Sequence, residues 1–263
     1  MLIAVTIPQM VLVRERAGVR GVARSPGIAF PLEEAILKAV ARYGIPTRGV
    51  FSCDLGSHVG VVQTSERGFR VLAIDRGNYR LLPNFFGDPF AFADLFPPDW
   101  GATGTLEDIL WTERHGPEPR TLDSTRDVLK AGDGPLILGA AQALLDGCRV
   151  WLADEPPGTV RAIWQLLPTR ARAELCAAEF AHDNVLNFHL AAGPGAPPDA
   201  LSAERCRDYP TGRYELGVQA AVEGNDAREL RWLFERRTST ETLKLALGIV
   251  AFAFLAALVL RFV

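Results

Sequence analysis

The sequence predicts an α+β N-terminal unit with a mostly antiparallel sheet, then an α/β unit, and finally a C-terminal transmembrane helix. Three features indicate this: a strand-like start with a hairpin, alternating strands and helices after residue 121, and a long apolar run near residue 263. With 263 residues, 48% of them hydrophobic, the chain can bury the cores of two moderate domains. The predicted segments are an α+β domain at 1–100, a linker at 101–120, an α/β domain at 121–211, a helical juxtamembrane segment at 212–241 and a transmembrane tail anchor at 242–263.

The N-terminal domain opens with strand-like residues and then a helix. Residues 1–16 have no basic start, are interrupted by Pro8 and reach charge at Arg14, so they do not read as a signal peptide. Residues 31–44 predict an amphipathic helix, because Pro31 fits a first helical position and Gly44 fits a C-terminal stop.

A β-hairpin is predicted after this helix. Residues 59–64 and 69–75 are rich in β-branched and aromatic side chains, and Gly68 can adopt the positive φ that a short hairpin loop requires. Residues 48–56 read as a further strand. These strands favour an antiparallel sheet in the first domain.

Residues 87–100, GDPFAFADLFPPDW, predict a short capped helix. Asp88 suits the N-cap and Pro89 the first helical position, while Pro97 ends the helix at Phe96. Aromatic side chains at helical spacing usually pack into a core, and Trp100 would close the loop beyond. We interpret the segment as a packed connector; a ligand-binding role is the alternative.

The second domain alternates helices with strands. The prediction is a helix at 135–147, a strand at 148–154, a helix at 157–168, a helix running into a strand at 169–181, a strand at 184–192 and mostly helix at 212–237. The crossovers have the length that a parallel β-α-β unit needs, which favours an α/β domain.

The apolar run predicts a membrane anchor. From Leu245 to Leu260, sixteen residues carry no polar side chain, and they span about 24 Å as a helix. Lys244 and Arg261 can extend this length toward the roughly 30 Å hydrocarbon core by snorkelling. The alternative is a buried C-terminal helix, but such a helix normally keeps a polar stripe. The expected lipid-facing residues include Leu245, Ile249, Phe252, Phe254, Leu258 and Leu260.

The residues that flank the run predict its orientation. Arg231, Arg236 and Arg237 precede it, and only Arg261 follows it. Positive residues favour the cytoplasmic side, so we expect a single-pass protein of the cell inner membrane with a cytoplasmic N-terminal body. The alternative for these arginines is an ordinary solvated helix face.

Two groups of residues are candidates for catalysis. Cys53 and His58 lie close together in the sequence, and a thiol beside an imidazole can act as a nucleophile, although a buried structural thiol is the alternative. The second group consists of His182, Asp183, Asn187 and His189, of which Asn187 and His189 would share one face of a strand. The spacing of its histidines matches no metal-ligand template, so no metal site is expected.

Composition excludes several function classes. The chain has 28 Lys and Arg against 31 Asp and Glu, a net charge of −3, which makes nucleic acid a poor partner. Four scattered cysteines fit neither a zinc site nor a disulfide framework. No nucleotide-binding, dinucleotide-binding, nucleophile-elbow or zinc-protease motif occurs. We therefore expect no cofactor.

A family resemblance gives a functional direction. The order IPQMVLVRERAGVRGVARSPGI, FRVLAIDRGNYR and FFGDP, followed by GPLILGAAQALLDGCRVWLADEP, resembles the N-terminal and middle domains of the bacterial GTPase-associated protein 1 family. The likeness covers about residues 8–190. Gln9, Ser25, Gly87 and Asp88 match recurrent positions of that family, whereas the run after Asp88 departs from it.

The resemblance implies an adaptor or sensor in bacterial conflict or defence systems, with a GTPase or an effector module as protein partner. Together with the anchor, it predicts a membrane-tethered, non-catalytic adaptor or scaffold. One alternative is a hydrolase or transferase that uses Cys53 and His58, or the 182–189 strand. Another is a small-ligand sensor with a pocket beside Asp88 and Trp100.

Overall fold

The chain has an α+β fold built on one mixed sheet, as seen in a computed structural model that describes residues 3–44, 47–112, 119–236 and 247. The strands are β1 (Ala4–Ile7), β2 (Gln9–Glu15), β3 (Gly18–Arg24), β4 (Gly49–Asp54), β5 (His58–Ser65), β6 (Gly68–Asp75), β7 (Gly104–Thr105), β8 (Ile109–Thr112), β9 (Arg149–Leu152), β10 (Ala177–Ala178), β11 (Leu190–Ala192) and β12 (Ala200–Leu201). The helices are α1 (Phe30–Tyr43), α2 (Arg76–Leu81), α3 (Pro83–Phe86), α4 (Pro89–Leu95), α5 (Leu122–Ala131), α6 (Gly134–Leu145), α7 (Pro157–Leu166), α8 (Thr169–Arg172), α9 (Ala203–Arg207), α10 (Arg213–Glu223) and α11 (Ala227–Glu235).

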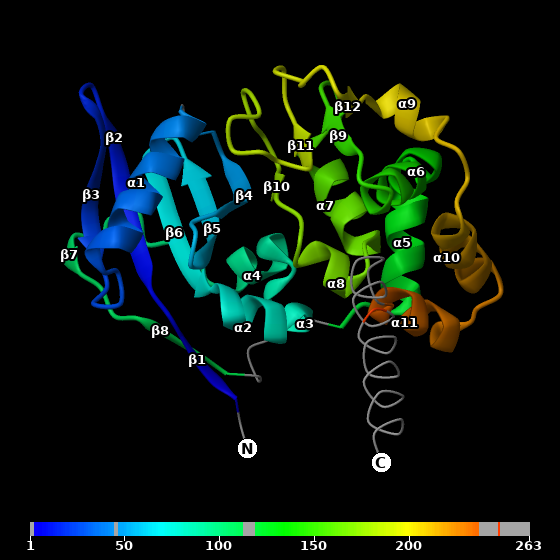
Figure 1. Cartoon of the computed structure of the whole chain (residues 1–263), viewed down its shortest axis with the longest axis horizontal. Coiled ribbons are helices and arrows are strands. Elements are labelled where there is room, and N and C mark those ends of the chain that lie inside the picture. The colour runs from blue at the N-terminus through cyan, green and yellow to red at the C-terminus, as the bar shows by residue number, and fades with distance from the viewer. Residues whose placement is uncertain (1–2, 45–46, 113–118, 237–246, 248–263) are drawn as a thin grey trace, which may run out of the picture.

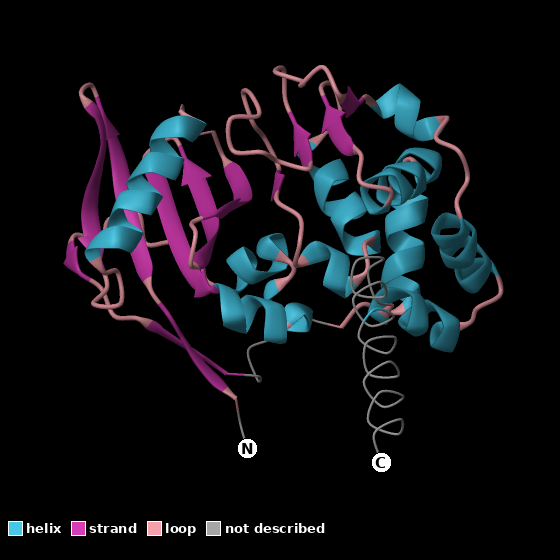
Figure 2. Ribbon diagram, in the orientation of Figure 1, coloured by secondary structure: helices cyan, strands magenta, loops and turns pink. Residues whose placement is uncertain are grey.

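Ten strands of the described residues form the sheet, in the order β12-β9-β11-β10-β4-β5-β6-β2-β3-β7 (Figure 1). Strands β1 and β8 make a separate antiparallel ribbon. Figure 2 shows the longer strands on one side of the molecule and most helices gathered around the shorter strands on the other.

The N-terminal part of the sheet is antiparallel, as predicted. The hairpin β5–β6 runs in register from His58↔Asp75 to Ser65↔Gly68, and Gly68 has φ 150°. A Cβ atom at Gly68 would lie 2.1 Å from the backbone oxygen of Leu12, so this position also needs glycine for close strand packing. The predicted helix at 31–44 is α1, and it ends at Gly44 with φ 85°.

The second part contains the predicted parallel pairs, but its strands are shorter than expected. Strand β9 pairs with β11 and β12, and β10 pairs with β11, all in parallel. The helix running into a strand that the sequence predicts at 169–181 is present, with α8 as a four-residue helix and β10 as a two-residue strand.

The predicted strand at 184–192 is wrong over its first half. Asn184 closes a turn, accepting from the Phe188 N–H at 2.6 Å and donating to the Phe188 carbonyl at 3.2 Å. Asn187 inside this turn has φ 58°, a left-handed conformation that asparagine tolerates. Asn187 and His189 therefore do not share a strand face; only Leu190–Ala192 form β11.

Strand pairing joins the two predicted domains. Strand β10 pairs antiparallel with β4 through Ala178↔Phe51, so a single sheet crosses from the first predicted domain to the second. The predicted linker at 101–120 contains β7 and β8, which pair with β3 and β1. Strands this short leave no periodic pattern, and only their partners make them strands.

The sheet has an apolar core on each face. On the α1 side, Tyr43 stacks on Phe51 with ring centroids 4.2 Å apart, and both belong to the same buried cluster. On the other side, Phe86, Phe92, Trp111 and Trp164 are completely buried under the helices. Phe90 and Phe92 of the 87–100 segment thus lie in the core, as the sequence indicated, whereas Phe96 is partly buried against it and Leu95 is exposed.

Among the described residues, no helix combines the length and the apolar character needed to cross a membrane. The predicted anchor residues Leu245, Ile249, Phe252, Phe254, Leu258 and Leu260 lie outside the described residues.

Candidate functional site

Helix α4 begins as the sequence predicts. The Oδ1 atom of Asp88 accepts the backbone N–H groups of Phe90 and Ala91 at 3.2 and 3.1 Å. Pro89 occupies the first helical position, and the helix ends one residue earlier than predicted, at Leu95. Asp88 is therefore an N-cap, and it is buried.

The second carboxylate oxygen of Asp88 contacts a buried arginine. Its Oδ2 atom lies 3.1 Å from Nη1 of Arg172 in α8, and the side chains are 12% and 6% exposed. A buried ion pair of this kind loses the hydration of both charges, and removal of one partner leaves the other uncompensated. The contact ties the 87–96 segment to the second half of the chain.

Gly87 acts through its backbone carbonyl and leaves no room for a side chain. Its carbonyl accepts the indole N–H of Trp164 at 3.0 Å, and a Cβ atom at this position would lie 2.5 Å from the Pro83 carbonyl oxygen. Gly87 and Asp88 thus lie together, as expected from their adjacent positions, and both hold α4 against α7 and α8.

A second arginine, Arg120, is half-buried and interacts electrostatically with Arg172. It donates to the carbonyls of Gln165 and Leu167 at 2.9 and 2.6 Å and to the Thr169 hydroxyl at 2.6 Å. Its guanidinium also lies 3.9 Å from the centre of the Phe234 ring. Burial first, and then the positive charge of Arg172, lowers the pKa of Arg120.

Three polar atoms here have no hydrogen-bond partner among the described residues: Nε and Nη2 of Arg172 and the hydroxyl of Tyr79. Tyr79 lies in α2 and is 1% exposed. Burial raises the pKa of its phenol, and the charges of Asp88 and Arg172 act on it as well. We call Asp88, Arg172, Tyr79, Arg120 and Tyr214 the Arg172 cluster; Tyr214 donates its hydroxyl to the Leu166 carbonyl.

Gln9 and Ser25 meet each other but lie at the other end of α4. The Gln9 N–H donates to the Ser25 hydroxyl at 2.9 Å, and the Gln9 side-chain oxygen accepts from Arg70 at 2.7 Å. Arg70 also donates to the carbonyl of Phe96, just beyond α4. Burial lowers the pKa of Arg70 to about 10. Trp100 is half-buried in the turn after the two prolines, beyond this end of the helix.

Cys53 and His58 do not form a hydrogen-bonded pair. Cys53 is 1% exposed, and burial raises the pKa of its thiol. His58 hydrogen-bonds through Nδ1 to the Ser57 hydroxyl at 2.9 Å, and burial lowers the pKa of its imidazole. A thiol held in its neutral form, with the imidazole bound elsewhere, lacks the activated state of a nucleophile.

In the second group, His189 binds a backbone N–H and His182 packs against an aromatic ring. Nδ1 of His189 accepts the backbone N–H of Cys176 at 3.0 Å. His182 packs edge-on against Phe180, with ring centroids 4.9 Å apart. Within the described residues, no group of three or more His, Cys, Asp or Glu side chains could hold a metal ion.

A shallow groove of about 410 Å³ lies between α5 and α10, and neither Asp88 nor Trp100 lines it. Its lining residues are Arg126, Leu129, Lys130, Gln219, Val222 and Glu223. Arg126 donates to Asp123 and Asn225 at 2.9 Å each, so its guanidinium supports the neighbouring turn.

Sequence reasoning found Gly87 and Asp88 but missed Arg172, Tyr79 and Arg120. These residues are distant in the chain, and the local sequence around Tyr79 and Arg120 does not indicate burial. The one local sign of burial is that Arg172 closely follows the apolar LLP segment at 166–168.

Comparison of the chain with family models, with curated proteins and with solved structures finds no match.

Proposed function

We propose that this protein is a membrane-tethered, non-catalytic adaptor that holds a protein partner at the inner membrane, with its N-terminal body in the cytoplasm. The observation that carries the proposal is the sixteen-residue apolar run at Leu245–Leu260. It lies between Lys244 and Arg261, as expected of a short membrane-spanning helix.

Helix α11 supports this role because its exposed face suits a membrane interface. Leu230, Leu233 and Phe234 face the protein core, whereas Trp232 is 62% exposed. Arg228, one turn before Trp232, and Arg231 are exposed beside it. Tryptophan prefers the level of the lipid headgroups, and arginine favours the anionic cytoplasmic leaflet.

The length of the connection keeps α11 close to the bilayer. Eight residues, 237–244, separate Arg236 from the apolar run. A fully extended chain of this length reaches about 28 Å. If the run spans the bilayer, α11 therefore lies within that distance of the headgroups.

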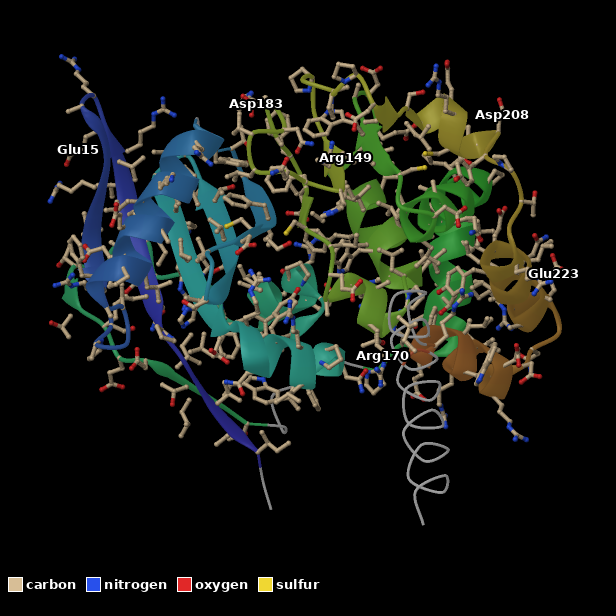
Figure 3. The ribbon with its side chains drawn as sticks, viewed as in Figure 1. Glu15, Arg149, Arg170, Asp183, Asp208 and Glu223 are labelled. Atoms are coloured by element: carbon tan, nitrogen blue, oxygen red, sulfur yellow. The ribbon has the colours of Figure 1, made fainter. Side chains whose placement is uncertain are left out.

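A row of helices extends this face. Helix α2 contacts α3, α3 contacts α8, and α8 contacts α11. Figure 1 shows α2, α3 and α11 along one edge of the molecule, and Figure 3 places Arg170 of α8 at the same edge. Arg80 is exposed in α2, and Leu81 beside it is 78% exposed. We propose that this edge faces the membrane.

The geometry of the candidate nucleophile also favours an adaptor. The buried Cys53 thiol and the His58 imidazole bound to Ser57 argue against a Cys/His hydrolase or transferase. The resemblance to the GTPase-associated protein 1 family adds the partner class, a GTPase or an effector module of a bacterial conflict system.

Membrane fractionation of the full chain and of a chain lacking 242–263 tests the proposal. We expect the full chain in the inner-membrane pellet, extractable by detergent but not by carbonate, and the shortened chain in the supernatant. In inside-out vesicles, protease should remove the N-terminal body. Recovery of the full chain in the supernatant would overturn the tethering.

The adaptor role needs a separate test. Cross-linking in the native host, followed by affinity purification, should recover a stoichiometric protein partner from the membrane. A Cys53→Ala, His58→Ala variant should retain the same partner. Loss of partner binding and appearance of a turnover defect in that variant would favour the enzyme instead.

A further inference from the structure

We propose that the Arg172 cluster binds a small oxyanion, such as inorganic phosphate or a small carboxylate, at the free edge of the Arg172 guanidinium. This binding site is separate from the membrane anchor, and its test does not depend on the adaptor role.

The free edge of the Arg172 guanidinium has the geometry for this ligand. Nη1 is engaged with Asp88 at 3.1 Å, whereas Nε and Nη2 have no partner among the described residues. The N–H groups of Nε and Nη2 point in parallel from one edge of the planar group. This is the edge that binds two oxygens of a carboxylate or phosphate at once.

Tyr79 is a second buried donor of the Arg172 cluster. Its hydroxyl is buried and has no partner among the described residues, and its phenol interacts electrostatically with Arg172 and Asp88. Two nitrogen donors and one hydroxyl thus remain without acceptors in a region closed to bulk water. Buried polar atoms are nearly always satisfied, so the missing partner is an acceptor.

The charge balance favours an anion over water. Asp88 neutralises one of the two guanidinium groups, and Arg120 directs its contacts to neutral carbonyl and hydroxyl oxygens. The negative charge of Glu235 acts on Arg120 from outside the cluster. A water molecule can accept hydrogen bonds from Arg172 but brings no negative charge, whereas an oxyanion adds negative charge beside the two guanidinium groups.

The enclosed position determines how binding would be observed. Arg172 is 5% exposed and Tyr79 1%, so the ligand enters through local opening and leaves slowly. Because the cluster exists only in the folded chain, an anion that binds there raises the unfolding midpoint with increasing concentration.

The experiment measures urea unfolding of the full-length protein in a non-ionic detergent, with added phosphate, acetate or chloride at constant ionic strength. We expect phosphate or acetate to raise the midpoint, and chloride to have a smaller effect because it cannot bridge two nitrogens. A response to phosphate alone identifies a phosphate site, and a response to acetate alone a carboxylate site.

Variants assign the effect to the cluster. Arg172→Lys keeps a positive charge but lacks the two-nitrogen edge, and should lose at least tenfold in anion affinity. Tyr79→Phe keeps the ring and should lose severalfold. Arg149→Lys, at a surface arginine that binds Asp199 at 2.8 Å, is the matched control and should respond like the wild type.

Two results would overturn the proposal: equal midpoints in all three anions, or an anion response that Tyr79→Phe and Arg172→Lys both retain in full. If Arg172→Lys fails to fold, the anion response of Tyr79→Phe tests the site in its place. Isothermal titration of the wild type with inorganic phosphate gives a second measurement. Absence of saturable heat in that titration, with no midpoint shift in acetate, would also reject the site.

Discussion

The backbone N–H of Val50 donates to a carboxylate oxygen of Glu179 over 2.7 Å, at the point where β4 and β10 join the two parts of the sheet. The other oxygen of Glu179 pairs with Arg161 of α7, which also contacts Asp94 of α4 at 2.6 Å. Glu179 therefore links the two parts of the sheet, which meet at β4 and β10, to helices α7 and α4. We expect the two halves to unfold together.

Glu179→Ala should destabilise the protein by about 2–3 kcal/mol, because it leaves the Val50 N–H and one side of Arg161 without their acceptor. Urea unfolding followed by circular dichroism measures the change. Asp199→Ala breaks an exposed pair with Arg149 and serves as the control, with an expected loss below about 1 kcal/mol. Equal losses in both variants would contradict the central position of Glu179.

Asp88→Ala should cost more than a lost helix cap alone. Asp88 and Asp226 each accept two backbone N–H groups at the start of a helix, but only Asp88 is buried against an arginine. We expect a loss of about 1 kcal/mol for Asp226→Ala and about 3–5 kcal/mol for Asp88→Ala. Thermal and urea unfolding provide the comparison, and similar losses would show that the Arg172 contact adds nothing.

Three thiols, those of the buried Cys53 and Cys206 and the half-buried Cys176, should resist alkylation in the folded protein. Burial raises the pKa of Cys206 to about 12 and that of Cys176 to about 11, and it raises the pKa of Cys53 as well. Thiolate is the reactive form, so at pH 8 iodoacetamide should modify these residues only after unfolding. Mass spectrometry of labelled peptides measures the rates. Rapid labelling of Cys53 in the native protein would instead support the catalytic alternative.

Stability should fall in mildly acidic solution because of His189. Burial, followed by the charge of Arg149, lowers the pKa of His189 in the folded chain. The unfolded chain then binds the proton more readily, so the stabilisation is complete above about pH 6.5 and decreases as the pH falls below it.

His189→Asn tests this assignment. Asparagine keeps an acceptor for the Cys176 N–H but cannot take up a proton, so the decrease in stability between pH 6.5 and 5 should become shallower. Urea midpoints measured across this range give the slope. A slope identical to that of the wild type would assign the acid sensitivity to other groups.

Local signals in the sequence were sufficient for several elements. Pro31 and Gly44 bound α1, Gly68 allows the β5–β6 turn, and Asp88 with Pro89 starts α4. Each of these depends on the conformational preference or the hydrogen bonding of one or two neighbouring residues, which a sequence displays directly. The apolar composition of 245–260 also predicts an anchor, a prediction that lies outside the described residues.

The tertiary structure decided which distant residues meet. The Ala178↔Phe51 pairing merges two predicted domains into one sheet, and the Asn184 turn replaces half of a predicted strand. The Asp88–Arg172 contact joins residues 84 positions apart. Such contacts depend on how helices and strands pack and on which charges burial brings together, and the periodicity of a single segment carries no information about either.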